Sequence, residues 1–316
     1  MSLDEDVAGI VAGDDAGTAA ALAVSSLQAG IYVVLRALGV GAGSIIGCDA
    51  LFPFGALAVM HANGQPRLPE LGPAGLASAE AWRQAGMAES AAAVVTVLFG
   101  AEPVLPARSS GHPPVVIDAA LSPFAAPRLL EVADVAGVSF AAGKPVSCEG
   151  GGLLLFRDRG LRDEVASWSL FGVRRGAAGD DPPAPFVPGL DLRLSPLLMP
   201  VLRRSLTALE AMRGHLDDSW ARAARSLRGK GWRELPNEGS GGWYRAGFAA
   251  RGTDCPRRLC ALGIQWKRLR LDRVAASLVA DADERVRRAA EEVAARLVWY
   301  RPDITGERGD LPEAGS

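Results

Sequence analysis

The stretch SFAAGKPVSCEGG, residues 139–151, places one lysine, Lys144, in a turn built from small residues. An apolar run at residues 153–156 follows and predicts a buried strand. Because alanine and glycine surround Lys144, its amine should be partly desolvated, which lowers its pKa and makes it a better nucleophile toward a carbonyl carbon. The stretch therefore predicts a strand, a turn and a second strand around a lysine suited to Schiff-base chemistry.

A second informative run, VVIDAA, occupies residues 115–120. Its apolar part predicts a buried parallel strand that ends in one carboxylate, Asp118. Ligands of open α/β sheets bind at the carboxyl ends of the strands. Lys144 follows another expected strand, residues 137–140, so we expect Lys144 and Asp118 to face one crevice.

The first half of the chain alternates short apolar runs with helical stretches, the pattern of a parallel sheet with crossover helices. Serines at positions 25 and 26 precede an expected helix from about residue 27 to 38. Further strands are expected at residues 21–24 and 93–99. Residues 176–188 are rich in glycine, proline and aspartate and predict a long loop.

Two amphipathic helices are expected in the second half. Ser195-Pro196 is a good helix start, and Pro200 should kink the opening of that helix. The apolar stripes are Leu202, Leu206, Leu209 and Met212 in the first helix, and Val286, Ala290, Val293 and Leu297 in the second. We expect the first helix to pass from a large α/β domain, residues 1–203, into a small C-terminal domain, residues 204–316.

The composition is that of a soluble globular protein. The chain has 316 residues, of which 49% are hydrophobic, and a formal net charge of −2. This length allows one large or two medium domains with a filled core. The basic residues are dispersed instead of clustering with aromatics, which argues against a nucleic-acid surface and for a small-molecule partner.

The cysteines, the histidines and the N-terminal residues further limit the class of protein. The four cysteines and three histidines form no metal-ligand spacing, and a disulfide framework is not expected in a chain of this size. The acidic N-terminus lacks the basic start of a signal peptide, and polar residues interrupt the apolar run at residues 18–35. We therefore expect a protein of the reducing cytoplasm with no membrane span and no metal.

Together these motifs resemble the DegT/DnrJ/StrS family of pyridoxal-phosphate (PLP) sugar aminotransferases. The family pattern runs from a strand with Glu-Asp-Ala-Ala-Gln, through Ser-Phe-x-x-x-Lys, to Gly-Glu-Gly-Gly. The matching residues are Asp118, Ser139, Phe140 and Lys144, then Glu149, Gly150 and Gly151 after a one-residue gap, and GLDLRLS at 189–195 where the family has GYNYRMS. The resemblance implies an α/β protein of the aspartate aminotransferase-like fold (fold type I), with a mainly parallel-sheet large domain and a small C-terminal α+β domain, acting as a homodimer.

The resemblance also implies roles for single residues. Lys144 would bind PLP and move a proton as general base and acid, and Asp118 would keep the pyridine nitrogen protonated. Phe54 takes the place of the aromatic residue that stacks on the cofactor ring. The reaction implied is amino transfer from an amino donor to a keto sugar or related keto compound. The remaining expected cofactor contacts are Ser139, Ser26, Gln28 and Asp191.

Four residues depart from the family pattern. At the phosphate site, Leu27 replaces a glycine and Gln28 replaces a threonine. Leu121 replaces a glutamine near the phenolic oxygen, and Asp191 replaces an asparagine that reaches the phosphate across the dimer. Two alternatives therefore stay open. One is a homologue that binds PLP weakly or not at all and acts as a partner or scaffold subunit, and the other is a PLP enzyme with a reaction other than transamination.

Overall fold

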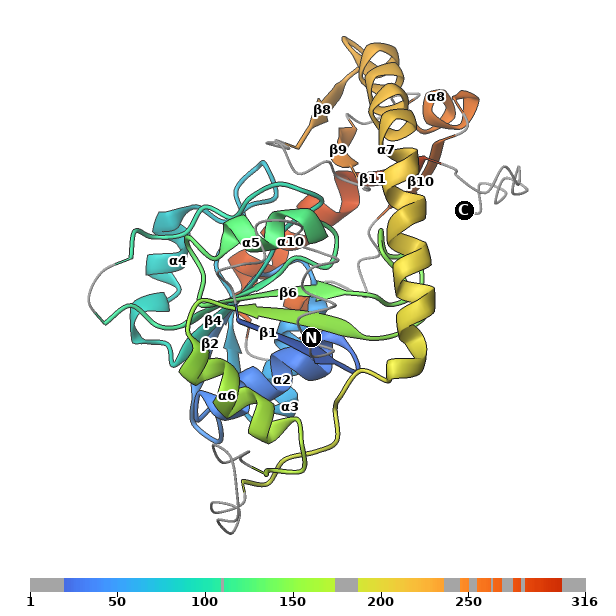
Figure 1. The fold of residues 1–316 in the computed structure, drawn as a ribbon. Coiled ribbons are helices and arrows are strands. Elements are labelled where there is room, and N and C mark those ends of the chain that lie inside the picture. The colour runs from blue at the N-terminus through green and yellow to red at the C-terminus, as the bar shows by residue number, and fades with distance from the viewer. Residues whose placement is uncertain are drawn as a thin grey trace.

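The computed structural model describes residues 20–108, 111–173, 187–235, 245–249, 255–262, 264–268, 275–279 and 282–302. Its centre is a seven-stranded sheet in the order β1-β7-β6-β5-β4-β2-β3 (Figure 1). β7 runs antiparallel to both neighbours and the other pairs are parallel, so all the strands except β7 point the same way. The strands are β1 (Ala20–Val24), β2 (Ile45–Cys48), β3 (Gln65–Arg67), β4 (Ala92–Thr96), β5 (Val115–Asp118), β6 (Val135–Ser139) and β7 (Gly152–Phe156).

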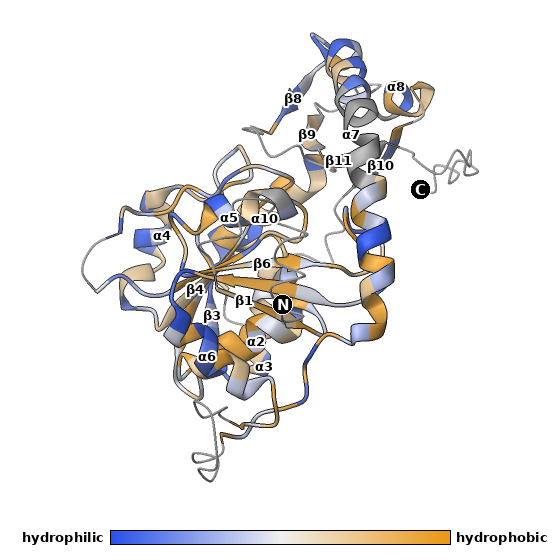
Figure 2. Cartoon of the chain, viewed as in Figure 1, coloured by the Kyte–Doolittle hydropathy of each residue, from blue (hydrophilic) through white to orange (hydrophobic). Residues whose placement is uncertain are grey.

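Helices cover both faces of this sheet, and β4 to β7 are buried along their whole length. This burial explains why these strands are almost continuously apolar instead of alternating. In Figure 1, α2, α3 and α6 lie together on one side of the sheet, with α5 and α10 on the other, and Figure 2 shows the apolar colours concentrated on the strands. The helices of this part are α2 (Leu27–Ala37), α3 (Pro53–His61), α4 (Ala79–Gln84), α5 (Ala126–Leu129) and α6 (Arg159–Trp168), with short 3-10 turns at Met87–Glu89 and Pro123–Ala125.

A second sheet forms in the C-terminal part, with strand order β10-β11-β9-β8 and antiparallel pairing throughout. The long helix α7 runs beside the first sheet and reaches the second one (Figure 1). The elements are a 3-10 turn (Pro196–Leu198), α7 (Met199–Leu227), β8 (Trp232–Glu234), β9 (Arg245–Ala249), α8 (Cys255–Ala261), β10 (Ile264–Arg268), α9 (Ala275–Leu278), α10 (Glu284–Arg296) and β11 (Leu297–Pro302).

The chain returns to the first sheet between the last two strands. The N–H groups of Ala275 and Ala276 at the start of α9 donate to the carbonyls of Leu51 and Ala50, at 3.3 and 3.2 Å. The apolar face of α10 is buried in the same core as the first sheet. The boundary expected between residues 203 and 204 falls inside α7 and stays a prediction.

The expected elements of the first sheet are confirmed, with local corrections. Strand β4 ends at Thr96 instead of residue 99, because the chain turns there and Phe99 adopts a φ of 51°. Pro200 lies in the first turn of α7, where its missing N–H has no intrahelical acceptor, so it starts the helix instead of kinking it. Most of the loop expected at residues 176–188, and the side chains of Leu209 and Met212, lie outside the described residues.

Candidate active site

The carboxyl edge of the first sheet gathers the predicted catalytic residues. Asp118 is the last residue of β5, and Ser139 is the last residue of β6, the neighbouring parallel strand. Lys144 lies in the turn that follows, where its N–H donates to the carbonyl of Ala141 at 3.1 Å. The sheet thus brings the lysine and the acid to one edge, as predicted.

Asp118 is only 4% exposed. Its Oδ1 accepts a 2.9 Å hydrogen bond from the N–H of Ala120. Burial raises the pKa of this carboxyl, while the Ala120 hydrogen bond and the nearby Lys144 lower it. Asp118 is therefore a buried acid whose ionised form is favoured by a positive partner.

Lys144 is half-buried. Burial lowers the pKa of its ammonium below the ordinary value, and the charge of Asp118 opposes this effect. A lower pKa leaves a larger share of the amine neutral, which is the form that attacks a carbonyl carbon. The pair combines an amine of lowered pKa with a buried carboxyl group that interacts electrostatically with it.

The start of α2 lies at the same edge. Ser26 caps the helix, its Oγ accepting from the N–H of Ala29 at 3.1 Å, and it bridges to Gly151 just before β7. Ser139 pairs in register with Gly152, the first residue of β7, so its hydroxyl belongs to the same region. These residues place hydroxyl groups at the positive end of a helix dipole, where an anion is favoured.

Leu27, which replaces a glycine of the family pattern, is a core residue. It is buried, and a methyl group added at Gly137 would lie 2.3 Å from its Cδ1. Its side chain therefore fills the space above a glycine of β6, beneath the first turn of α2. Gln28, the next residue, is half-buried.

Phe54 lies in the first turn of α3 and is 48% exposed. Core packing does not account for an aromatic ring with this exposure. Its neighbour Phe52 is the ring that packs inward, edge to face against Phe99 with centroids 5.6 Å apart.

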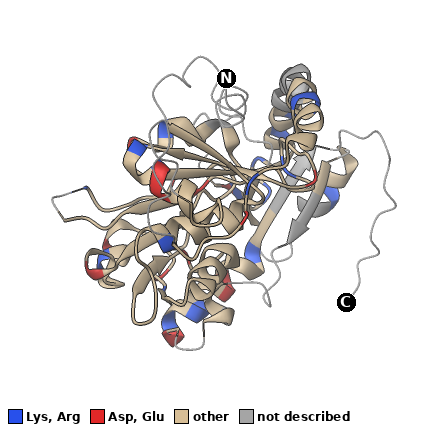
Figure 3. Ribbon diagram, turned by 60° about the horizontal axis from the view of Figure 1, so that its bottom comes forward, with Lys and Arg blue, Asp and Glu red and all other residues tan. Residues whose placement is uncertain are grey.

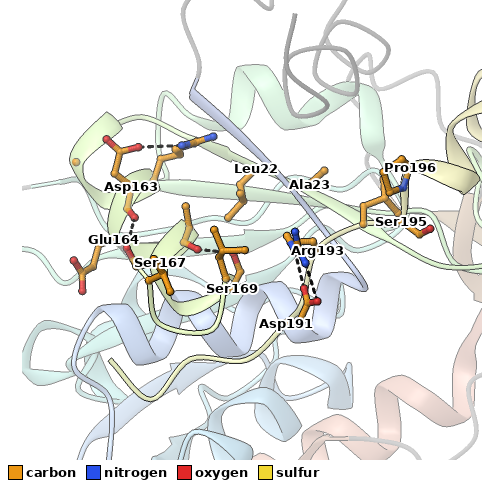
Figure 4. Close-up of a pocket in the computed structure, with 16 residues that line it drawn as sticks. Leu22, Ala23, Asp163, Glu164, Ser167, Ser169, Asp191, Arg193, Ser195 and Pro196 are labelled. Carbon is orange, nitrogen blue, oxygen red and sulfur yellow. Dashed lines mark hydrogen bonds and ion pairs between the residues drawn. The ribbon is translucent and has the colours of Figure 1, made fainter. Parts of the chain in front are cut away.

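Asp191 lies elsewhere, in a cavity of about 850 Å³ between β1, α6 and residues 191–196 (Figure 4). Its two carboxylate oxygens accept hydrogen bonds of 2.8 and 2.9 Å from Arg193. The hydrogen bonds from this guanidinium hold the pKa of Asp191 below its usual value. Neither Lys144 nor Asp118 lines this cavity, so the structure does not bring Asp191 together with them in one chain.

Two further residues at the carboxyl edge, Asp49 and Thr96, are absent from the set predicted from the sequence. Asp49 follows β2 directly, and Thr96 ends β4. The signal was present, because residues 45–49, IIGCD, repeat the pattern of an apolar strand followed by an aspartate seen in VVID.

The donor set fits PLP. A bound PLP needs an amine for its carbonyl carbon, an acid for its ring nitrogen and donors for its phosphate. Lys144 and Asp118 would supply the first two, and the hydroxyls of Ser26 and Ser139 at the start of α2 would supply donors for the third. Among the described residues no group of three or more histidine, cysteine or acidic side chains could hold a metal ion.

Comparison with known proteins agrees with this geometry. The model of the DegT/DnrJ/EryC1/StrS aminotransferase family matches residues 13–240. Among solved structures, the aminotransferase TlmJ from Streptoalloteichus hindustanus is 20% identical with a TM-score of 0.74, covering 94% of this chain and 83% of its own. The sugar aminotransferase CalS13 from Micromonospora echinospora is 18% identical with a TM-score of 0.68, and the match covers 96% of this chain and 92% of CalS13. 3-Amino-5-hydroxybenzoic acid synthase is 18% identical with a TM-score of 0.69, covering 94% and 83%. A search of curated proteins found no match.

The fold is that of a fold type I PLP-dependent transferase, and the predicted fold class is confirmed. The chain belongs to the DegT/DnrJ/EryC1/StrS aminotransferase family, as the motifs predicted. It is accordingly a PLP-dependent aminotransferase. No helix in the described part of the chain is long and apolar enough to cross a membrane.

Proposed function

We propose that Lys144 and Asp118 are the catalytic residues of this aminotransferase, and that its acceptor is a keto sugar or a related keto compound. The observation that carries the site is the pairing of a half-buried lysine with a buried aspartate at the carboxyl edge of the sheet. Phe54, Ser139, Ser26 and Gln28 complete the proposed cofactor site, and Asp191 is proposed to contribute from a second subunit.

Each proposed residue has a defined task. When bound, PLP supplies an electron-withdrawing ring that stabilises negative charge on the substrate carbon. The carboxylate of Asp118 would hold a proton at the ring nitrogen, and the Ala120 hydrogen bond and Lys144 favour this ionised form against the effect of burial. Lys144 binds the cofactor and, once released from it, removes and returns the proton at the substrate carbon as base and then acid. Burial lowers the pKa of its ammonium, which enlarges the share of neutral amine that can act as the base.

The substrate class rests on the family and on structural relatives. CalS13 is named a sugar aminotransferase, and this chain covers 92% of its length. 3-Amino-5-hydroxybenzoic acid synthase has the same fold and is named for an amino compound that is not a sugar, so a related keto compound is the second candidate. Biosynthesis of a natural product is the setting that both names favour.

A homodimer is part of the proposal. Leu197, in the 3-10 turn before α7, is 85% exposed, and Val201, in the first turn of α7, is 48% exposed. Leu190 and Phe171, which share a backbone hydrogen bond, are also exposed. A second copy is the simplest partner to cover these apolar side chains. Figure 3 shows acidic and basic residues interspersed along the ribbon of the described residues.

The buried free thiols of Cys48 and Cys148 suit a reducing cytoplasm, the proposed location.

The substrate proposal is tested by half-reactions. Protein loaded with PLP is mixed with glutamate, glutamine or alanine, and the loss of the cofactor's visible band is followed. Addition of a keto sugar to the protein whose cofactor has taken up the amino group should restore the visible band, and mass spectrometry should detect an aminated sugar. No spectral response to any of these donors would contradict transamination, while a response to donors with recovery only by non-sugar keto compounds would favour the second candidate.

A further inference from the structure

Three neighbouring parallel strands end in polar side chains at the carboxyl edge. β2 is followed by Asp49, β4 ends at Thr96 and β5 ends at Asp118. β4 lies between the other two strands, and Thr96 pairs in register with Asp118. Thr96 thus stands between two aspartates, of which the proposed function uses only one.

The carboxylate of Asp49 is held on both oxygens. Its Oδ2 accepts a 2.6 Å hydrogen bond from Oγ1 of Thr96, which is 8% exposed. Its Oδ1 accepts from the N–H groups of Leu51 and Phe52, at 3.0 and 2.7 Å. All three donors are neutral, and no ion pair of Asp49 occurs within the described residues.

The surroundings of Asp49 are apolar apart from two titratable groups. The small cavity beside it is lined by Thr96 and by side chains such as Leu71, Trp82 and Leu98. Alanines of α9 pack over the loop that follows it. The titratable groups that interact with it are Cys48 on its own strand and Asp118 across β4, and Lys144 interacts with Asp118 in turn.

The hydrogen-bond geometry around Asp49 does not require a charge. An asparagine could accept both N–H groups through its oxygen and donate its amide to Oγ1 of Thr96, which would then accept instead of donate. Burial raises the pKa of Asp49 to about 6, against the lowering effect of its hydrogen bonds. The ionised form is therefore costly at neutral pH, and costly charges are retained where they serve a site.

We propose that Asp49, fixed by Thr96, is a positioning residue of the cofactor site, whose negative charge adds to that of Asp118 and favours retention of the proton at the ring nitrogen of bound PLP. This inference rests on the proposed roles of Lys144 and Asp118. A second negative charge two strands from the first favours a positive ring, and it does so only when Asp49 is ionised.

The test is the pH dependence of PLP affinity, measured on the full chain by quenching of tryptophan fluorescence. Relative to Asp49→Asn, wild-type affinity should rise as the pH passes through about 6. The two proteins should bind PLP equally at pH 5. Across two strand spacings, the charge should give wild type an advantage of about 2- to 20-fold at pH 8.

Variants of Thr96 provide a second test of the inference, independent of any change at Asp49. The Thr96 hydrogen bond lowers the pKa of Asp49, so Thr96→Val should move the inflection to higher pH, and Thr96→Ser should restore it. Asp134→Asn is the matched control, because Asp134 precedes β6 at the opposite edge, where it accepts from the N–H of Val115 and pairs with Arg108. Its affinity profile should follow wild type.

The inference would be overturned if the PLP affinities of wild type and Asp49→Asn changed in parallel with pH. It would also be overturned if the inflection of the affinity curve of Thr96→Val lay at the same pH as that of wild type. Neither result touches the proposed site, which fails separately if Lys144→Ala keeps the visible band of bound PLP. If Asp49→Asn does not fold, the Thr96 pair still decides the inference.

Discussion

Replacing Asp49 by asparagine should stabilise the cofactor-free protein at neutral pH. Burial raises the pKa of Asp49 from 3.8 to about 6. Between these values the native state binds more protons than the unfolded state, so the free energy of unfolding falls as the pH rises from about 4 to about 6. A difference of roughly two pH units, at about 1.4 kcal/mol per unit, amounts to about 3 kcal/mol.

The variant removes this loss while its oxygen keeps both backbone hydrogen bonds and its amide donates to Oγ1 of Thr96, in place of the bond that Asp49 accepts. Wild type and Asp49→Asn should therefore have similar free energies of unfolding near pH 4, and the variant should be more stable above pH 7 by up to about 3 kcal/mol. Urea unfolding followed by tryptophan fluorescence measures both values. Asp134→Asn, which loses an ion pair with Arg108, should show no gain at either pH. A variant no more stable than wild type at pH 8, or a difference that does not change with pH, would refute the reasoning.

Three further outcomes follow from the packing. Gly152→Ala should lower the free energy of unfolding in urea by about 2 kcal/mol or more. The added methyl would lie 2.8 Å from the backbone N of Leu27 and 2.9 Å from the carbonyl oxygen of Val138. Unchanged stability would show that the helix can shift. Ser26→Ala should cost about 1 kcal/mol through loss of the α2 cap and should also weaken PLP binding, whereas stability loss with unchanged PLP affinity would remove Ser26 from the phosphate site. Leu197→Glu should weaken the proposed dimer at least about tenfold on analytical ultracentrifugation with the circular dichroism spectrum preserved, and an unchanged dimer would place the interface elsewhere.

The sequence predicts β1, β4, β5, β6 and β7 of the first sheet because these strands are short, apolar and largely buried. β2 was not predicted, and β3 could not be, because its residues Gln65–Arg67 are largely polar and exposed. Lys144 and Asp118 could be found because each follows such a strand, and the edge of a parallel sheet brings strand ends together. The antiparallel direction of β7 could not be read from its apolar residues, since a strand buried on both faces looks alike in either direction.

Residues whose roles depend on other elements were harder to predict. Asp49 accepts a hydrogen bond from Thr96, 47 positions away, and that contact requires β2 and β4 to be neighbours. The partner of Asp191 is Arg193, only two residues on, but nothing in the spacing distinguishes this pair from two solvated charges. The return of α10 to the first core is a long-range contact that its amphipathic stripe predicts only as burial somewhere.

The central claim is that Lys144 carries the cofactor, and borohydride reduction of the PLP-loaded protein followed by peptide mass spectrometry tests it most directly. The visible band should disappear on reduction, and the mass of reduced PLP should appear on the peptide containing Lys144, with no label and no band in Lys144→Ala. Labelling of a different lysine, or a full band in the Lys144→Ala protein, would contradict it.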